Sequence, residues 1–245
     1  MLACSRLVNH EQCARRRFLA QRGLRKPGCP HPATWVDRKL ADTKGRLCSD
    51  HFRAWERLKP LEPRNTLVAR VLNDRGMATL LFDLLTTAEE LDRVNAFNIP
   101  LLAGRLVEAI RWINDQPSVA ELPLGLFGAS TGAAAALVAA ARLPRRVEAI
   151  VSRGGRPDLA RDALDQVHAP TLFIVGGNDV GVIDLNEHAM ARLRGPKSLQ
   201  IIAHASHLFP EPGALEAVIE HAARWFQQYL SPTHSASASR RTEVA

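Results

Sequence analysis

Residues 122–142, LPLGLFGASTGAAAALVAAAR, decide the fold of this chain. The apolar residues 123–127 are typical of a buried strand, and the run over residues 133–142 is strongly helical. Between them, residues 128–132 form a G-x-S-x-G sequence centred on Ser130. In this strand–turn–helix context the sequence predicts a nucleophile elbow, although its glycines also suit a tight turn in any doubly wound fold.

The small residues around Ser130 have a physical role in such an elbow. A serine on a tight strand-to-helix turn lies in a strained backbone conformation, and bulky neighbours would clash with the helix beside it. Its hydroxyl then projects above the sheet, close to the partial positive charge of the helix N-terminus. We therefore expect the backbone N–H of Thr131 to bind a developing oxyanion.

Working outward, strand-like and helix-like segments alternate from residue 63 onward. The sequence predicts helices over residues 63–74, 101–113, 133–142, 157–166, 184–193 and 213–229. It predicts strands over residues 77–85, 123–127, 147–152, 170–175 and 198–202. Alternation of this kind indicates an α/β fold, with a mostly parallel sheet covered by helices on both faces.

An acid and a histidine follow Ser130 in the order that such a fold requires of a hydrolase. Asp179 comes directly after the strand at residues 170–175, and His207 follows the strand at residues 198–202. Ser130 is the expected nucleophile, His207 the general base and later the general acid, and Asp179 the group that orients the imidazole.

Two nearby residues compete for these roles. Asp184 is close to Asp179, but we interpret it as the N-cap of the next helix. His204 is close to His207, but it lies nearer the strand and is expected to point into the sheet edge. The catalytic assignment is therefore Ser130, Asp179 and His207.

These residues carry a family resemblance. From residue 63 to 230 the chain resembles dienelactone-hydrolase-like α/β-hydrolases in PRNTLVARVLNDRGMATLLFDLLT, LGLFGASTGAAAALVAAA, VEAIVSRGGRPDLA, APTLFIVGGNDVGVIDLN and HASHLFPEPGALE. The resemblance implies an eight-stranded scaffold that hydrolyses small esters or lactones through an acyl-enzyme, without a metal or other cofactor. Dienelactone hydrolase proper has a cysteine at the elbow where this chain has Ser130, so the resemblance does not extend to dienelactone as the substrate.

The region before residue 63 departs from that family. In these hydrolases a central apolar strand ends in a glycine-rich loop that donates a second oxyanion N–H. Residues 49–62 read SDHFRAWERLKPLE, with neither feature. Residues 1–62 are expected either to complete the sheet in another way or to form a separate region, and the sheet is expected to be incomplete on its N-terminal side.

The N-terminal region also differs in charge and in cysteine content. Residues 1–70 hold 16 Lys and Arg against 6 Asp and Glu, whereas the rest of the chain holds 16 against 19. The N-terminal region contains no recognisable nucleic-acid-binding motif, so we favour the interpretation that it is a solvated segment. Three of its four cysteines and a nearby histidine could form a zinc site, but the spacing of the first pair is too wide for a typical one. The potential ligands are Cys13, Cys29, Cys48 and His51, with Cys4 and His31 as spares.

Two arginines follow the strand at residues 147–152. Arg153 and Arg156 would lie on the same rim as the catalytic residues and could hold an anionic acyl group. Pairing with a neighbouring carboxylate such as Asp158 is the favoured interpretation.

The sequence predicts three parts: an N-terminal region of uncertain fold over residues 1–62, a hydrolase domain over 63–230 and a disordered tail over 231–245. With no secretory signal pattern and no run of about 20 apolar residues, a cytoplasmic protein without membrane contact is expected. The expected function is a serine hydrolase with a small ester or lactone substrate. The alternative is a catalytically impaired hydrolase fold beside a basic, zinc-binding interaction module. The oligomeric state is left open.

Overall fold

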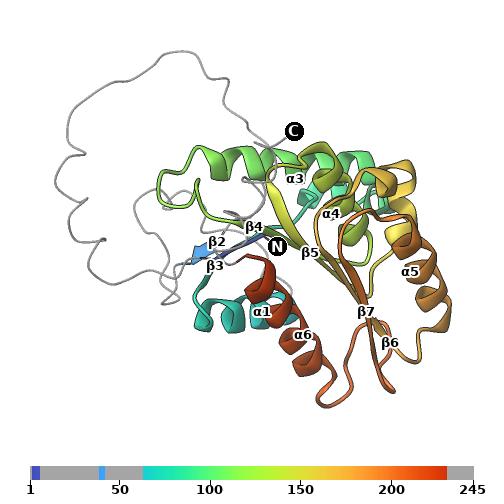
Figure 1. Ribbon diagram of the computed structural model, residues 1–245. Helices are drawn as coiled ribbons and strands as arrows, with labels where there is room; N and C mark the ends of the chain where they lie inside the picture. Colours follow the sequence, from blue (N-terminus) through green and yellow to red (C-terminus); the bar gives the residue numbers. More distant parts are fainter. Residues whose placement is uncertain (1, 6–38, 42–62, 231–245) are drawn as a thin grey trace, which may run out of the picture.

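The strands of a parallel sheet are buried on both faces, so they need helices on each side. The computed structural model describes the backbone of residues 2–5 and 39–41 and all atoms of residues 63–230. Within these ranges, seven strands form one sheet in the order β2-β3-β1-β4-β5-β6-β7 (Figure 1). The α/β architecture predicted from the sequence is confirmed.

The strands are β1 (Leu2–Ser5), β2 (Lys39–Ala41), β3 (Met77–Leu81), β4 (Leu124–Ala129), β5 (Val147–Arg153), β6 (Thr171–Gly176) and β7 (Lys197–Ile202). The α-helices are α1 (Pro63–Asp74), α2 (Thr87–Glu90), α3 (Ile99–Asn114), α4 (Thr131–Arg142), α5 (Val180–Arg192) and α6 (Ala214–Tyr229). Two 3₁₀ segments, η2 (Arg93–Phe97) and η3 (Pro157–Gln166), complete the list. Strands β4 to β7 run parallel to one another, whereas β1 and β2 are antiparallel to their neighbours.

Successive residues of the central strands point to opposite faces and belong to two separate cores. On β4, Leu126 packs with α3 and α4, whereas Phe127 packs with α6. Ile150 and Val151 of β5 divide between the two cores in the same way. Figure 1 shows α1 and α6 lying together on one side of the sheet, and α3 and α4 on the other. Both faces of the central strands are therefore covered, as the apolar runs predicted.

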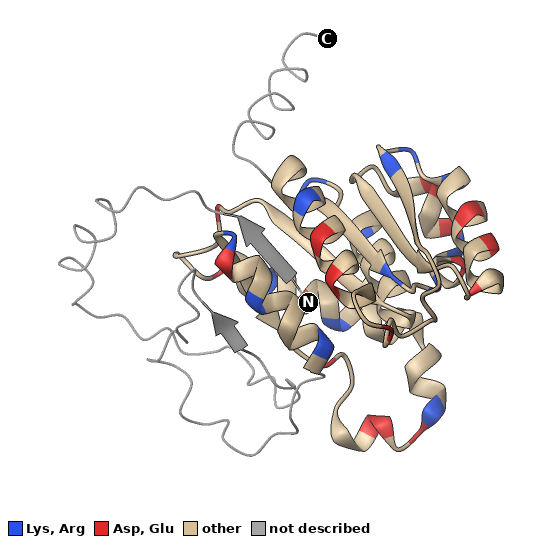
Figure 2. Ribbon diagram, turned by 90° about the horizontal axis from the view of Figure 1, so that it is seen from below, with Lys and Arg blue, Asp and Glu red and all other residues tan. Residues whose placement is uncertain are grey.

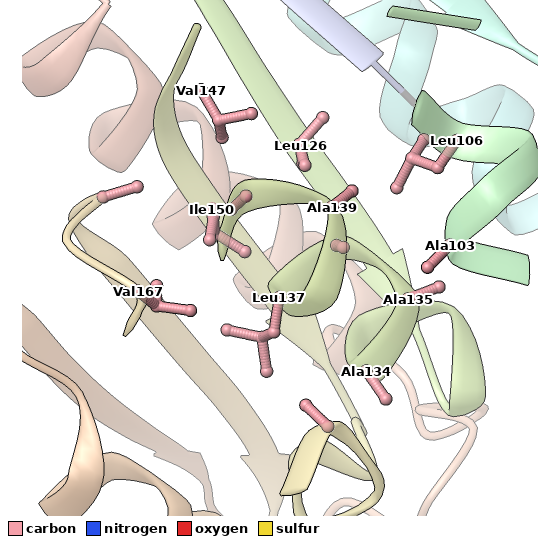
Figure 3. Packing of buried hydrophobic residues seen from close by; sticks show 14 of the residues in the cluster. Ala103, Leu106, Leu126, Ala134, Ala135, Leu137, Ala139, Val147, Ile150 and Val167 are labelled. Atoms are coloured by element: carbon pink, nitrogen blue, oxygen red, sulfur yellow. The ribbon is translucent and has the colours of Figure 1, made fainter. Parts of the chain in front are cut away.

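The alanine-rich helix α4 lies close to the sheet beside the elbow. Ala134 and Ala135 are fully buried, and their small side chains let the helix approach its neighbours closely. Leu137, also fully buried, fills space between α4 and β5 near Ile150 (Figure 3). The alanine run that predicted a helix is thus also a packing surface.

Strand β1 fills the sheet position between β3 and β4. Leu2 is opposite both Leu80 and Leu126, in antiparallel register with each strand. The sequence predicted a sheet that is incomplete on its N-terminal side, with residues 1–62 either completing it in another way or forming a separate region. In the structure two strands from these residues, β1 and β2, belong to the sheet. Because β1 is antiparallel to β4, its last residue, Ser5, lies at the opposite end of the sheet from Ser130. The described ranges contain seven strands, not the eight that the resemblance implied.

Most predicted helices and strands are present within a few residues of their expected ends, but three details differ. The strand expected over residues 77–85 ends at Leu81. Helix α5 begins at Val180 with Asp179 at the N-cap position, so the assignment of Asp184 as the cap is wrong: Asp184 lies inside the helix. The polar segment containing α2 and η2 was not predicted. Its signal was the capping box formed by Thr86 and Glu89.

Several sequence predictions fall outside the described residues. They include the proposed zinc ligands, the basic stretch before residue 63 apart from two strand backbones, and the tail over residues 231–245. Within residues 63–230, no group of three or more His, Cys, Asp or Glu side chains is arranged to hold a metal ion. None of the helices described is both long and apolar enough to cross a membrane. Basic and acidic residues both occur along the described helices (Figure 2).

Gly125 of β4 is expected to be essential for the packing of α6. A Cβ atom there would lie 2.6 Å from Cε1 of Phe226 and 2.9 Å from Cδ1 of Leu230, both fully buried. We expect Gly125→Ala to lower the unfolding free energy by about 1–3 kcal/mol through overpacking. Gly104→Ala is the control, since no atom lies within 4 Å of its Cβ position in α3. Urea unfolding measures both, and equal stability of the two variants would contradict the prediction.

Candidate active site

The residues assigned to catalysis follow neighbouring parallel strands. Ser130 comes directly after β4, Asp179 three residues after β6 and His207 five residues after β7. Because β4 to β7 are parallel, these carboxyl ends lie at one edge of the sheet, where α/β folds bind their ligands. The loop after β5 lies at the same edge, between the strand bearing Ser130 and the strand preceding Asp179.

Ser130 has the strained backbone conformation expected of an elbow. Its φ of 49° and ψ of −125° are rare for a residue with a side chain. The turn is held by two backbone hydrogen bonds: Ser130 N–H donates to Arg153 O at 3.3 Å, and Arg156 N–H donates to Ser130 O at 3.1 Å. No larger residue fits at position 128, because a Cβ on Gly128 would lie 2.5 Å from the carbonyl oxygen of Gly132.

The hydroxyl of Ser130 is not used to cap α4. Serine at an N-cap position commonly accepts a hydrogen bond from the first helical turn. Ser130 occupies that position for α4, and its side chain makes no such bond. The hydroxyl is therefore not committed to capping the helix.

Asp179 and His207 form a direct pair. Asp179 Oδ2 lies 2.6 Å from His207 Nδ1. A carboxylate can only accept, so Nδ1 donates in this contact, and in the neutral imidazole Nε2 is then the nitrogen with the lone pair. Asp179 is also the N-cap residue of α5, yet its side chain makes no cap hydrogen bond. The Asp179 side chain is 19% exposed and that of His207 is 39% exposed, which leaves the imidazole accessible from solvent.

The loop after β5 lies against the His207 loop. Gly154 has a φ of 48°, and a Cβ there would lie 2.9 Å from the carbonyl oxygen of His207 and 3.6 Å from its Cε1. Arg153 and Arg156, on either side of the two glycines, hold the backbone of Ser130. Ser130 and His207 therefore contact the same short loop.

The loop that carries His207 is anchored on both sides. His204 and Phe209 both have left-handed backbone angles, with φ of 59° and 55°. Phe209 is buried, and Glu211 Oε1 accepts a hydrogen bond from Ser206 N–H at 3.0 Å. Hydrogen bonding by Ser206, chiefly from its side chain, lowers the pKa of Glu211. The carboxylate form of Glu211 thus supports the residue next to His207.

A cleft of about 270 Å³ opens on the side of the elbow away from β5. Its walls come from the elbow, the segment after β3, the α2–η2 segment and the helices α1, α3 and α4, and they combine apolar side chains with polar ones such as Asp83 and Glu90. The lining residues are Asn65, Phe82, Asp83, Leu84, Leu85, Glu90, Ala96, Leu102, Leu106, Leu126, Phe127, Gly128, Ala129, Thr131, Gly132 and Ala136. Thr131, the expected oxyanion residue, is among them.

The two arginines after β5 differ in their surroundings. Arg156 donates two hydrogen bonds to Asp158, at 2.9 and 2.8 Å, as the favoured interpretation predicted. These bonds raise the pKa of Arg156. Arg153 is buried, with its guanidinium carbon 5.8 Å from the centre of the Phe127 ring. Neither arginine is among the residues that line the cleft.

One further sequence interpretation, the orientation of His204, has a structural outcome. His204 does not point into the sheet edge; it is exposed, on a left-handed turn, and its carbonyl accepts a hydrogen bond from Asn178. Sequence reasoning also missed the supporting roles of Gly154 and Glu211. The glycine pair in SRGGRPD was a signal for the first, whereas Glu211 had no local signal because its role depends on how the chain turns back after β7.

Comparisons with known proteins show the family of this chain. The family model "Dienelactone hydrolase family" matches residues 83–231. This chain belongs to the dienelactone hydrolase family. A crystal structure of dienelactone hydrolase from Anabaena variabilis is 56% identical, with a TM-score of 0.67, and the match covers 69% of this chain and 81% of that one. The resemblance described from the sequence is confirmed.

One further match shares the fold at low identity, and two others are much longer than this chain. Est1E from Butyrivibrio proteoclasticus, at 15% identity and a TM-score of 0.60, shares the fold over 79% of this chain and 97% of its own. Two Mycobacterium tuberculosis proteins named "Putative phosphoribosyl transferase" are 56% identical over 167 residues. That match covers 68% of this chain but only 38% of each relative, so the chain spans well under half the length of these proteins.

Glu211 is expected to make the fold sensitive to acid. Its folded-state pKa is lowered, so the stability that it contributes is present above the ordinary carboxyl pKa of about 4.3 and is lost as the pH falls through the lowered value. Glu211→Gln keeps an acceptor oxygen but does not titrate. The unfolding free energy of this variant should fall less than that of the wild type between pH 6 and pH 3.

Glu187→Gln, which removes an exposed carboxylate from α5, is the matched control for the change in charge. An equal loss of stability on acidification in Glu211→Gln and in the wild type would show that the Ser206 contact does not contribute.

Proposed function

We propose that this chain is a serine hydrolase that cleaves small esters or lactones through an acyl-enzyme. The observation that carries the proposal is the 2.6 Å contact between Asp179 and His207, at the same sheet edge as a strained serine whose hydroxyl does not cap its helix. These are the three groups that acyl transfer by a serine needs, at the strand ends where the fold supports them.

In the first half of the reaction, Ser130 Oγ attacks the carbonyl carbon of the ester while His207 Nε2 takes the hydroxyl proton. Asp179 holds the imidazole through Nδ1 and stabilises the imidazolium that forms. The carbonyl oxygen becomes an oxyanion, and the N–H of Thr131 at the start of α4 donates to it. The tetrahedral species then collapses, the C–O bond to the leaving group breaks, and the alcohol departs with the proton from His207.

In the second half, His207 removes a proton from water, which attacks the acyl carbon. The bond to Ser130 Oγ breaks, the serine regains its proton from His207, and the carboxylic acid is released. A lactone follows the same steps, except that its leaving alcohol stays attached to the acyl group. The 39% exposure of the His207 side chain supports access of this water.

We propose hydrolysis for this chain and not the phosphoribosyl transfer that the Mycobacterium relatives are named for. The chain spans 38% of those relatives, and the family model that matches residues 83–231 is that of a hydrolase. The site residues named above are those of acyl transfer to a serine.

Ser130→Ala is expected to abolish turnover of p-nitrophenyl acetate and butyrate, because it removes the nucleophile. A fluorophosphonate probe should label the folded wild type and leave Ser130→Ala unlabelled. Equal rates for wild type and variant, with both folded, would favour the alternative of a catalytically impaired hydrolase fold.

Asp179→Asn is expected to lower kcat by about 10⁴-fold, because an amide at this position favours the wrong imidazole tautomer. Asp184→Asn is the matched control: it is the same substitution, five residues further along, on an exposed part of α5. Steady-state kinetics with p-nitrophenyl butyrate measure both. A similar effect of the two substitutions would contradict the assignment of Asp179.

A further inference from the structure

Asn186 is a polar side chain buried on a helix beside the candidate active site. It lies on α5, the helix that begins directly after Asp179, and its exposed fraction is zero. Its Nδ2 group donates to the carbonyl oxygen of Val182 at 2.7 Å, one turn earlier in the same helix, and to the carbonyl oxygen of Gly155 at 3.1 Å. The first bond is local, whereas the second joins α5 to the loop after β5.

Stability alone would not select an asparagine at position 186. Asparagine is a weaker helix former than leucine or alanine. The amide oxygen of Asn186, Oδ1, is buried and makes no hydrogen bond with the part of the chain that the structure describes, and a buried acceptor without a partner costs free energy. A leucine of similar size would avoid both costs. What leucine could not make is the hydrogen bond to the loop after β5.

Gly155, the acceptor of that bond, is tightly packed against two other elements. A Cβ on Gly155 would overlap the hydroxyl oxygen of Ser152, the residue before the end of β5. The same Cβ would lie 2.7 Å from the side chain of Ala133, in the first turn of α4. The hydrogen bond from Asn186 adds α5 to this contact. The backbone of Gly155 is therefore the point at which α4, α5 and β5 meet.

The residue after Gly155 connects this point to the proposed nucleophile. Arg156 N–H donates to the carbonyl oxygen of Ser130 at 3.1 Å, so a shift of Gly155 would move the support of the strained turn. Asp179 immediately precedes α5 and contacts His207 at 2.6 Å. One short path thus runs from the acid and the base, through α5 and the loop after β5, to the backbone of the serine.

We propose that Asn186 is a positioning residue, which ties α5 to Gly155 and so sets the position of Ser130 relative to the Asp179–His207 pair. This rests on the proposed function for the roles of those three groups. Asn186 acts through the loop and not on the substrate. Misplacement of a catalytic group by about 1 Å can lower a rate by roughly 100-fold, so one hydrogen bond at this point has a large effect on the rate.

Two variants test which of the hydrogen bonds matters. Asn186→Ala removes both, whereas Asn186→Ser keeps a donor for the carbonyl oxygen four residues earlier in the helix and loses the bond to Gly155. Both variants should lower kcat for p-nitrophenyl butyrate by about 10–100-fold and change KM by less than about twofold, because the lost contact is not with the substrate. A wild-type kcat in Asn186→Ser would assign the effect to the bond within α5 and overturn the proposal.

Asn73→Ala is the matched control. Asn73 is also a buried asparagine on a helix, and its Nδ2 group donates to the carbonyl oxygen of Met77 at 2.8 Å and to Oγ1 of Thr79 at 3.1 Å. Met77 pairs with Ser5, at the opposite end of the sheet from Ser130. Asn73→Ala should lower the unfolding free energy, as Asn186→Ala does, and leave the kcat of the folded protein unchanged. An equal fall of kcat in the two alanine variants would show a general loss of structure and contradict the positioning role.

Amide hydrogen exchange, measured by NMR without substrate, separates this proposal from the proposed function. The Arg156 amide should exchange at least about ten times faster, relative to the amides of β6, in Asn186→Ser than in the wild type and in Asn73→Ala. An unchanged ratio overturns the proposal even if Ser130 is a working nucleophile. A raised ratio in Asn186→Ser alone, with a wild type that hydrolyses no ester, supports the tie between α5 and Gly155 and contradicts only the proposed function.

Discussion

The backbone turn at Ser130 is the constraint on which the rest of the site depends. A non-glycine residue with φ of 49° is strained, and the strain persists only because the surrounding structure holds it. Two backbone hydrogen bonds, one donated to the last residue of β5 and one accepted from the loop after it, provide that support, and Gly128 allows the start of α4 to approach the end of β4. The buried alanines of α4 let the helix lie close enough to the sheet for the turn to form (Figure 3).

The same loop after β5 connects the other parts of the site. Its backbone holds Ser130 on one side, and Gly154 contacts His207 on the other. Buried Asn186, on the helix that begins after Asp179, donates to the carbonyl oxygen of Gly155 at 3.1 Å. The ends of four strands are therefore joined through a few residues, and displacement of this loop would disturb the nucleophile, the base and the acid together.

Strand β1 runs in the opposite direction to β4. The family resemblance implied a central strand that ends in a glycine-rich loop donating a second oxyanion N–H. The sheet position beside β4 holds β1, which is antiparallel to it, so Ser5 lies at the opposite edge of the sheet from Ser130. The described residues thus supply Thr131, at the N-terminus of α4, as the proposed donor at this edge, where the helix dipole adds to the effect of its N–H.

Much of this organisation follows from local patterns in the sequence. The alternation of apolar runs determined the α/β class, and the strand–turn–helix context of Ser130 determined the elbow, because hydrophobic period and turn composition act over a few residues. The rule that parallel strands end at one edge was enough to select Asp179 and His207, whose direct contact the structure shows. Tertiary structure alone decided the direction of β1 and the support of the His207 loop by Gly154 and Glu211. Each of these depends on which atoms come within a few ångströms from segments distant along the chain, and no short-range pattern encodes that distance.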